Sequence, residues 1–505
     1  MRLNIPAYKK IMLGCFLIGL GISLAHILFC TDVYNDISMF YGPITQAFAD
    51  GDWDRAFSGI IGPLNPALAS VFVKLGFHSF VALMIVSCIF YVLCIFPIFG
   101  FLRILLGNKN YAAWGCVMYI LTPKIIRFGC TGLLNSGRNF FLAGAVFLVL
   151  SFFEKVRTWK LILLGFCLAG LALNRGEGLL YAPLFIIWLL LIPLQEANWK
   201  LSRKISWMAF KRIFIVTTVT LICIQPRMVQ MYNETGVPCT DIRQAETAKM
   251  ALVSTGVFKE DVTQTSSKQT FVAENGRKRS KLLSFRKLHR LVDCFGRGSY
   301  WIYLGFALIG LGVMLFRKKF NFRLLLPISV IAYSTLIFFQ VILAYRYFTL
   351  NAMLMLPFSF TGLYFLYKQA EKRRLKYVFI AALIVMGIFQ AGNGMRKVLS
   401  RKYDYEKGIG DWLTVHKPEL ARGAELKMIS PKPQYSYWSG IPFVGGNEPT
   451  IYVDRDYLLK NKINLAVVDI KNTDMIKAIE NSGLYVEVKH PYKKVRVFVI
   501  IPLEK

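Results

Sequence analysis

Residues 31–70 read TDVYNDISMFYGPITQAFADGDWDRAFSGIIGPLNPALAS. This polar stretch follows a long apolar run at 11–29 and begins with two carboxylates, Asp32 and Asp36. A polar loop between a membrane span and a helix in the membrane interface suits chemistry on a lipid-linked substrate. We therefore expect an external catalytic loop at 31–76 and interpret the rest of the chain as its support.

The composition predicts an integral membrane protein. Of the 505 residues 55% are hydrophobic and 18% charged, which is fewer charges than the quarter or so found in soluble domains. Runs of about 20 apolar residues can span the hydrocarbon core. The clearest lie at 11–29, 80–102, 178–195, 298–316, 324–344 and 347–367, and the weaker ones at 111–123, 131–153, 157–173, 210–225 and 377–394. We expect about 11 transmembrane helices.

The net charge of +32 is distributed in a way that indicates topology rather than nucleic-acid binding. Basic residues gather in short segments at 2–10, 103–109, 155–160, 200–212, 317–323 and 368–376. If the spans alternate, these segments share one side, and the positive-inside rule places them and the N-terminus in the cytoplasm. The loop at 31–76, a second large loop at 226–297 and the tail from 395 then lie outside. We expect a lipid bilayer and no nucleic acid as partner.

A short helix is predicted within the first external loop. The segment FYGPITQAF, at 40–48, has an apolar face of a kind that suits a helix lying in the interface. That face is formed by Phe40, Ile44, Ala47 and Phe48. The alternative for the two carboxylates before it is that they are solvated loop residues or helix caps.

The same loop carries the frame of a known family. It reads D-x4-Y from Asp36 to Tyr41, then A-x3-G-D-W at 47–53, then G-P-L-N-P-A-L-A at 62–69. This frame resembles the first external loop of the polyprenyl-phosphate-sugar glycosyltransferases of the GT-C fold. That family (glycosyltransferase family 39) is related to the protein O-mannosyltransferases and to the lipid A aminoarabinose transferase. Members have Pro-Pro-Leu-Tyr-Pro where this chain has Asn65 in place of tyrosine.

Two later segments resemble the same family in the same order. LALNRGEGLLYAP, with Arg175 and Glu177, is similar to its Leu-Thr-Arg-Pro-Glu-Gly-Leu turn, and YRYFTLNAMLMLP, with Arg346, to its Arg-Tyr-x2-Pro segment. The chain departs from the family in GLLNSGRNFFLAGAVFLV, where Arg138 and its neighbours stand without the acid that members often carry. The role of that acid is open here, and with it the need for Mg²⁺ or Mn²⁺; we assign no metal ligands.

The resemblance implies transfer of a sugar from a polyprenyl-phosphate donor to a glycan, lipid or protein acceptor. Its general base would be Asp36, whose offset from Tyr41 matches the family frame, with Asp32 as second choice. Tyr41 and Glu177 join the substrate-binding set. Cations at the external span ends would hold the phosphate. They are Lys124, Arg127, Arg138, Arg175 and Arg346.

Each cation has a simpler explanation. Lys124 and Arg127 could be interfacial residues whose charged ends reach toward water, and Arg175 could serve only to pair with Glu177. Arg138 is different because an arginine inside a span is costly and usually marks a pair or a site.

From about 395 the composition becomes that of a soluble domain. Strands are predicted at ELKMIS and INLAVVDI, helices at GIGDWLTVHKPE and TDMIKAIENSG, and a closing hairpin at the end. We expect a small extracytoplasmic α/β domain at 395–505, behind a transmembrane domain at 1–394, that caps the site or helps select the acceptor.

The sequence thus predicts a polytopic α-helical membrane protein of the GT-C fold, a glycosyltransferase of the bacterial inner membrane in cell-envelope glycosylation. A flippase or transporter of lipid-linked sugars would show an internal repeat and charges along a route across the membrane, and neither is seen in the sequence. The other alternative is a noncatalytic family member that binds the lipid-linked sugar.

Overall fold

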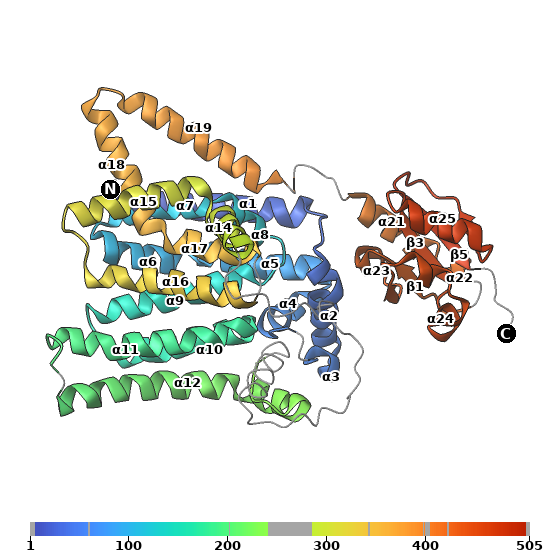
Figure 1. Cartoon of the computed structure of the whole chain (residues 1–505), viewed down its shortest axis with the longest axis horizontal. Coiled ribbons are helices and arrows are strands. Elements are labelled where there is room, and N and C mark those ends of the chain that lie inside the picture. Colours follow the sequence, from blue (N-terminus) through green and yellow to red (C-terminus); the bar gives the residue numbers. More distant parts are fainter. Residues whose placement is uncertain are drawn as a thin grey trace, which may run out of the picture. The chain divides into compact units, whose positions relative to one another are not determined.

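Figure 1 shows the chain as a computed structural model, which describes residues 6–58, 61–200, 202–240, 285–341, 344–396, 398, 404–421 and 424–500. The chain divides into two units. The first comprises Met1–Leu24, Phe57–Leu68 and Ile85–Met395, and the second Ala25–Ala56, Ala69–Met84 and Arg396–Lys505. Most of the expected loop at 226–297, namely 241–284, lies outside the described residues.

The first unit is helical. Its first half contains α1 (Ala7–Phe29), α4 (Leu64–Lys74), α5 (Ser79–Leu93), α6 (Ile95–Leu106), α7 (Lys109–Ile120), α8 (Pro123–Gly129), α9 (Asn135–Phe152), α10 (Thr158–Asn174), η2 (Gly176–Tyr181), α11 (Ala182–Glu196) and α12 (Arg203–Thr235). Three of these, α1, α4 and α5, continue into the second unit. Its second half contains α14 (Phe285–Ser299), α15 (Trp301–Phe316), η3 (Phe322–Leu324), α16 (Leu325–Val341), η4 (Tyr345–Phe348), α17 (Thr349–Leu354), α18 (Leu356–Lys372) and α19 (Lys376–Gly394). Helices α9 to α12 lie side by side (Figure 1).

Six helices in the described part of the chain are long and apolar enough to cross a membrane. Two bent pairs, joined at Tyr300 with a bend of 92° and at Met355 with a bend of 62°, raise the number to as many as 8. This is fewer than the 11 expected. Helix α7 has 12 residues and α10 has 17, and the first turn of α9 holds Asn135 and Arg138. Both α7 and α10 are shorter than the six candidate spans.

The second unit contains a mixed sheet of five strands. They are β1 (Met428–Ser430), β2 (Phe443–Gly445), β3 (Leu465–Asp469), β4 (Tyr485–Val488) and β5 (Val495–Ile500), in the order β2-β1-β3-β5-β4. Strand β1 pairs in parallel with β2 and β3, with Met428 opposite Phe443 and Leu465. Strand β5 pairs antiparallel with β3 and β4, with Val497 opposite Val467 and Val488. The predicted α/β character of the C-terminal segment is confirmed.

Helices cover both faces of this sheet, so its central strand is buried on both sides. In β3, Leu465 and Val467 pack into one apolar cluster and Ala466 and Val468 into another, as alternation along a strand requires. The helices and turns of this part are α21 (Asp404–Val415), α22 (Lys417–Ala421), α23 (Pro433–Ser439), η5 (Pro449–Tyr452), α24 (Arg455–Lys460) and α25 (Thr473–Ser482). The unit also holds η1 (Ile37–Tyr41), a π-helical turn, α2 (Gly42–Asp50) and α3 (Trp53–Ala56).

The first unit depends on a close crossing of α15 and α18. A Cβ at Gly310 would lie 1.9 Å from the carbonyl oxygen of Phe358, and one at Gly362 would lie 2.0 Å from that of Phe306. Such a small-residue contact lets two backbones approach and is common between membrane helices.

We expect Gly310→Ala to destabilise the protein by about 1–3 kcal/mol, since the methyl group forces the two backbones apart. Gly312→Ala is the matched control on the same helix, because no atom lies within 4 Å of its Cβ position. Both changes gain the same helix propensity, about 1 kcal/mol. Thermal unfolding in detergent compares the two; equal melting temperatures would contradict the close crossing.

Candidate functional site

Three of the sequence motifs meet at one end of the first unit. Arg138 lies in the first turn of α9, Arg175 directly follows α10, and Arg346 and Tyr347 form part of η4. We call these four residues the arginine–tyrosine cluster. Segments separated by up to about 200 residues in the sequence thus supply one set of side chains, with hydrogen bonds joining α9 to η4 and to Arg175.

The ring of Tyr347 is the centre of the cluster. The guanidinium carbons of Arg138, Arg175 and Arg346 lie 6.0, 4.7 and 5.3 Å from its centroid. Arg346 also donates a hydrogen bond to the Tyr347 hydroxyl at 3.4 Å. Attraction between a cation and the face of an aromatic ring stabilises this arrangement. It does not neutralise the charge.

Arg138 is fully buried and only partly satisfied. Its Nη2 donates to the carbonyl oxygen of Tyr347 at 3.1 Å and to the Thr349 hydroxyl at 3.4 Å. Its Nε and Nη1 have no hydrogen-bond partner among the described residues, and no described carboxylate pairs with it. A buried cation without a counterion is costly, so these nitrogens are well suited to an anionic ligand.

Arg175 is held by two partners. Its Nε lies 2.6 Å from Glu177 Oε1, and its Nη1 donates to Asn135 Oδ1 at 3.3 Å. The pairing with Glu177 that the sequence allowed therefore exists. Three guanidinium groups therefore gather around one aromatic ring, with Glu177 paired to one of them. Such a concentration of guanidinium groups attracts an anion.

Buried polar atoms without partners continue next to these arginines. Asn174 donates to Asn65 Oδ1 at 2.8 Å, and a Cβ at Gly137 would lie 2.1 Å from Asn174 Nδ2. The Gly-Pro-Leu-Asn-Pro motif therefore packs against the motifs of Arg138 and Arg175. The unpartnered atoms in the described structure include Asn65 Nδ2, Ser136 Oγ, Asn139 Oδ1 and Asn174 Oδ1. Unsatisfied buried groups of this kind usually indicate a missing polar ligand or water.

Lys124 lies beside the same turn. Its Nζ is 4.9 Å from the centroid of Tyr345, the residue before Arg346. Burial and the positive charges of Arg127 and Arg297 lower the pKa of Lys124. The guanidinium carbon of Arg127 lies 5.7 Å from the ring centroid of Phe128, which in turn packs on Tyr345. Both residues thus belong to the surroundings of η4.

The second unit holds the other predicted residues. Asp32 and Tyr41 are buried, and Asp36 is half-buried. Asp36 precedes η1, and its side chain makes no capping hydrogen bond there, so the capping alternative does not hold for this helix. Tyr41 precedes α2, and its carbonyl oxygen accepts from Thr45 at 2.7 Å.

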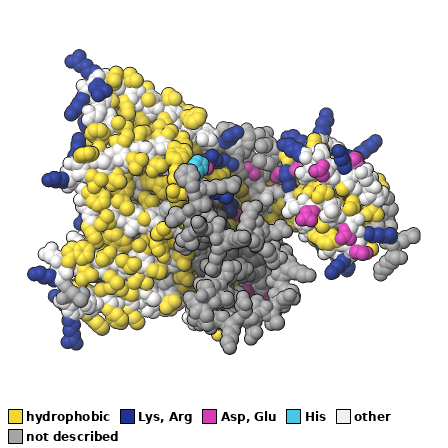
Figure 2. Space-filling view, viewed as in Figure 1, with side chains coloured by type: hydrophobic (Ala, Val, Ile, Leu, Met, Phe, Trp, Pro, Cys, Tyr) yellow, Lys and Arg dark blue, Asp and Glu magenta, His cyan; other side chains and the backbone are white. Residues whose placement is uncertain are grey.

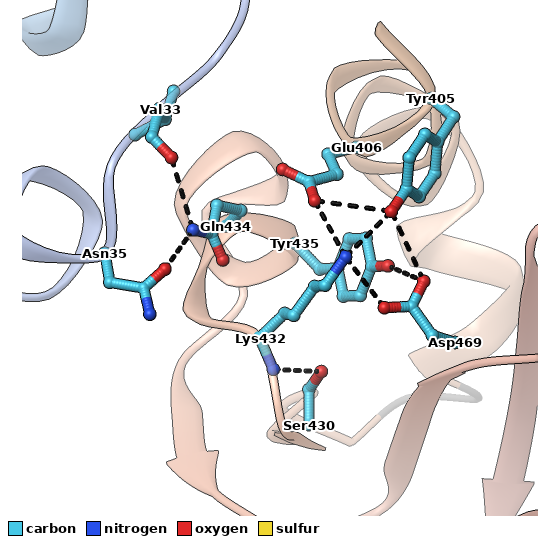
Figure 3. A network of polar contacts seen from close by, with 9 residues as sticks. All are labelled: Val33, Asn35, Tyr405, Glu406, Ser430, Lys432, Gln434, Tyr435 and Asp469. Carbon is cyan, nitrogen blue, oxygen red and sulfur yellow. Dashed lines mark hydrogen bonds and ion pairs between the residues drawn. The ribbon is translucent and has the colours of Figure 1, made fainter. Parts of the chain in front are cut away.

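Residues of the C-terminal segment hold this loop by side-chain contacts. Gln434 donates to the carbonyl oxygen of Val33 at 3.2 Å and to the side chain of Asn35, as Figure 3 shows. Thr31 donates to Asp404 Oδ1 at 2.5 Å. Further along, Tyr437 and Ser79 share a hydrogen bond of 2.8 Å. The residues on either side of Asp32 therefore contact α21 through the Thr31 hydroxyl and α23 through the Val33 carbonyl oxygen.

A lysine with two acidic partners lies beside these contacts (Figure 3). Lys432 Nζ is 2.8 Å from Glu406 Oε1 and 2.7 Å from Asp469 Oδ2, and it donates to the Tyr405 hydroxyl at 2.7 Å. Burial raises the pKa of Glu406, the Lys432 ammonium opposes that rise, and the Asp32 carboxylate adds to it. The electrostatic effect places Asp32 near this network.

Sequence reasoning missed several of these residues. Tyr347 stood in a recognised motif but was not assigned a role, and Asn174 stood beside Arg175. Lys432 and Gln434 were not assigned a role, because their partners lie far away in the sequence. Among the described residues no group of three or more His, Cys, Asp or Glu side chains is arranged to hold a metal ion.

We expect Lys432→Met to destabilise the second unit by about 3 kcal/mol at pH 7.5, because it leaves two carboxylates without their cation. The loss should shrink toward pH 4.5, the ordinary pKa of Glu406. Without Lys432, the pKa of Glu406 in the folded protein lies further above its value in the unfolded chain. Such a carboxyl is neutral and harmless to the fold below its unfolded pKa, and the folded state loses stability as the pH rises through the folded pKa.

Thermal unfolding of the full chain at both pH values measures this effect. Lys407→Met is the matched control, since Lys407 pairs with Asp411 at the surface, where such pairs contribute little. A loss that does not depend on pH would contradict the role of Glu406.

We expect Gln434→Leu to speed amide hydrogen exchange in residues 33–41 roughly 5- to 30-fold, since two hydrogen bonds that hold the loop are lost. Gln46→Leu is the control, because the exposed Gln46 bonds among the described residues only to Asp50 of its own helix. Unchanged exchange in Gln434→Leu would show that other contacts suffice to order the loop.

No protein-family model matches this chain, and no curated protein matches it significantly in sequence. Among solved structures it is similar to ArnT from Cupriavidus metallidurans in the apo state, with a TM-score of 0.61, 13% identity and 98% of each chain covered. The same protein bound to undecaprenyl phosphate gives a TM-score of 0.57 at 11% identity, covering 98% of this chain and 97% of that one.

The archaeal oligosaccharyltransferase AglB from Archaeoglobus fulgidus is similar as well. Its complex with an inhibitory peptide and a dolichol-phosphate gives a TM-score of 0.55 at 12% identity, covering 95% of this chain and 72% of that one. These similarities confirm the predicted GT-C fold over nearly the whole chain.

Proposed function

We propose that this chain of the GT-C fold is a glycosyltransferase that takes a sugar from a polyprenyl-phosphate donor and transfers it to a glycan, lipid or protein acceptor. The observation that carries the proposal is the arginine–tyrosine cluster, in which three guanidinium groups surround one ring and two nitrogens of the buried Arg138 have no hydrogen-bond partner among the described residues. The similar proteins ArnT and AglB were solved with a polyprenyl or dolichol phosphate bound.

The cluster would bind the phosphate of the donor. In the reaction the acceptor oxygen attacks the anomeric carbon, the bond from that carbon to the phosphate oxygen breaks, and the acceptor proton passes to a base. The phosphate changes from a diester with one negative charge to a monoester with two. Fixed cations in a site without bulk water stabilise the charge that develops. Arg138, Arg175 and Arg346 supply these cations, and Lys124 and Arg127 add positive potential beside them.

Asp36 would be the base and Asp32 the second choice. A carboxylate within hydrogen-bond reach of a hydroxyl can accept its proton. The contacts of Gln434 and Thr31 hold the backbone around both residues, so the C-terminal segment would position the base. Tyr41, buried at the start of α2, would line the same part of the substrate site.

The basic turns between spans orient the chain with its N-terminus in the cytoplasm. Both large external loops and the C-terminal domain would then be extracytoplasmic. In a bacterium this is the outer face of the inner membrane, where lipid-linked sugars serve cell-envelope glycosylation.

We expect Asp36→Asn to lower transfer of a labelled sugar from polyprenyl-phosphate donors at least 100-fold, since it removes the base. Arg138→Gln should lower transfer by a similar factor and weaken binding of polyprenyl phosphate, since it removes a phosphate contact. The controls are Asp54→Asn in the same loop and Arg103→Gln, which removes an exposed pair with Glu154. Size exclusion in detergent checks that each variant folds.

The outcomes separate the alternatives. Loss in Asp32→Asn but not in Asp36→Asn would assign the base to Asp32. Binding of polyprenyl phosphate without any transfer by the wild type would favour a noncatalytic binding protein, and movement of labelled donor across vesicles would favour a flippase. A parallel reaction with a chelator tests the dependence on Mg²⁺ or Mn²⁺.

A further inference from the structure

An apolar groove lies between α11 and α12 near the end where these helices are joined, and it continues into an open hollow along α12. Its apolar part, of about 220 Å³, is lined by Leu190 and Leu194 of α11 and by residues of α12 that include Ile213. Its open part, of about 750 Å³, is lined by Arg203, Lys204 and Trp207. Both parts share Ser206 and Phe210, which makes them one groove with an apolar floor and a basic mouth.

The charge at the mouth is positive and uncompensated in the described structure. Arg203 and Lys204 are exposed, and neither forms an ion pair with a described carboxylate. The nearest acid in the sequence, Glu196 at the end of α11, lies 3.8 Å from Arg212. The mouth therefore has two cations available for an anion from outside.

Aromatic side chains extend the groove along the outer face of α12. Trp207, Phe210 and Phe214 are 65, 55 and 58% exposed. Their rings stack in sequence, with centroid distances of 5.6 and 6.0 Å. Tryptophan is enriched at the boundary between membrane and water. In Figure 2 the flank of the helical unit is hydrophobic, and basic side chains stand at its edge at lower left, where α11 and α12 are joined in Figure 1.

The groove is separate from the arginine–tyrosine cluster. Helix α11 begins seven residues after Arg175 and ends at Glu196. Its 15 residues rise roughly 22 Å, so the cluster and the groove lie at opposite ends of the same helix. A ligand in the groove would face the other side of the membrane from the donor phosphate.

We propose that this groove binds one anionic phospholipid, with the phosphate at Arg203 and Lys204 and an acyl chain along Leu190, Leu194 and Ile213. The apolar floor requires a ligand with a hydrocarbon chain, which a soluble phosphate lacks. The two cations without acidic neighbours select a net negative headgroup over a zwitterionic one, whose ammonium they would repel. Basic pockets between membrane helices bind anionic headgroups in this way.

The probe is palmitoyl-oleoyl phosphatidylglycerol, with the phosphatidylcholine of the same chains as reference. The full chain is purified in detergent with an equal mixture of both lipids, and native mass spectrometry counts the lipids that remain bound. We expect one phosphatidylglycerol molecule to be retained. It should be preferred over phosphatidylcholine roughly 10- to 30-fold, because each cation contributes roughly a 3- to 5-fold preference.

Three variants test the site. The double change Arg203→Gln and Lys204→Gln should remove the preference. Ser206→Trp keeps both charges and fills the junction of the two parts, so it should also remove bound lipid. The matched control is Lys318→Gln with Lys319→Gln, which removes two cations from the basic turn after α15. Thermal unfolding confirms that each variant is folded.

Two results would overturn the proposal. If Lys318→Gln with Lys319→Gln loses as much bound phosphatidylglycerol as Arg203→Gln with Lys204→Gln, the lipid is attracted by the basic surface in general and not by the groove. Retention of phosphatidylglycerol by folded Ser206→Trp would show that the groove is not the site. Because none of these readouts measures sugar transfer, the outcome does not depend on the function proposed above.

Discussion

Positive charge buried at one end of the helical unit constrains the structure around it. A guanidinium that leaves water is tolerated only when dipoles, rings or counterions surround it. Arg138 donates a hydrogen bond to the carbonyl oxygen of Tyr347 and lies near the ring of the same residue. Arg175 follows the C-terminus of α10, where the helix dipole favours a cation. Glu177 pairs with Arg175 through its carboxylate. The ends of α9 and α10 bring partners to these guanidinium groups, but Nε and Nη1 of Arg138 still have no hydrogen-bond partner in the described structure.

The fold was predictable where the signal is local. The strand and helix patterns of the C-terminal segment correspond to β1, β3 and α25, because alternation and helical spacing are read within ten residues. The number of candidate spans differs from the prediction because hydropathy reads composition and not the length of the helix that forms. The apolar runs at 111–123 and 157–173 were counted as spans, whereas α7 and α10, which form there, have 12 and 17 residues.

The candidate site was predictable in part for a similar reason. Arg138 is costly inside an apolar run, and that cost is visible in the sequence. Arg175 and Arg346 were found through short motifs, and the structure brings all three around one ring. Lys432 and Gln434 were missed because their importance comes from partners about 25 to 400 residues away. No local pattern marks such a contact.

The bonds that hold the loop around Asp32 join residues 373 and 401 positions apart. A chain is synthesised from its N-terminus at about 5–20 residues per second. Residues 31–35 therefore emerge early, and the side chains of Asp404 and Gln434 that order them are made only after nearly four hundred further residues. During that interval the first span can already be inserted while the loop after it lacks its final conformation. Ordering of this loop is consequently a late event in biogenesis, since a chain that ends before residue 404 lacks the side chains that hold the residues around Asp32.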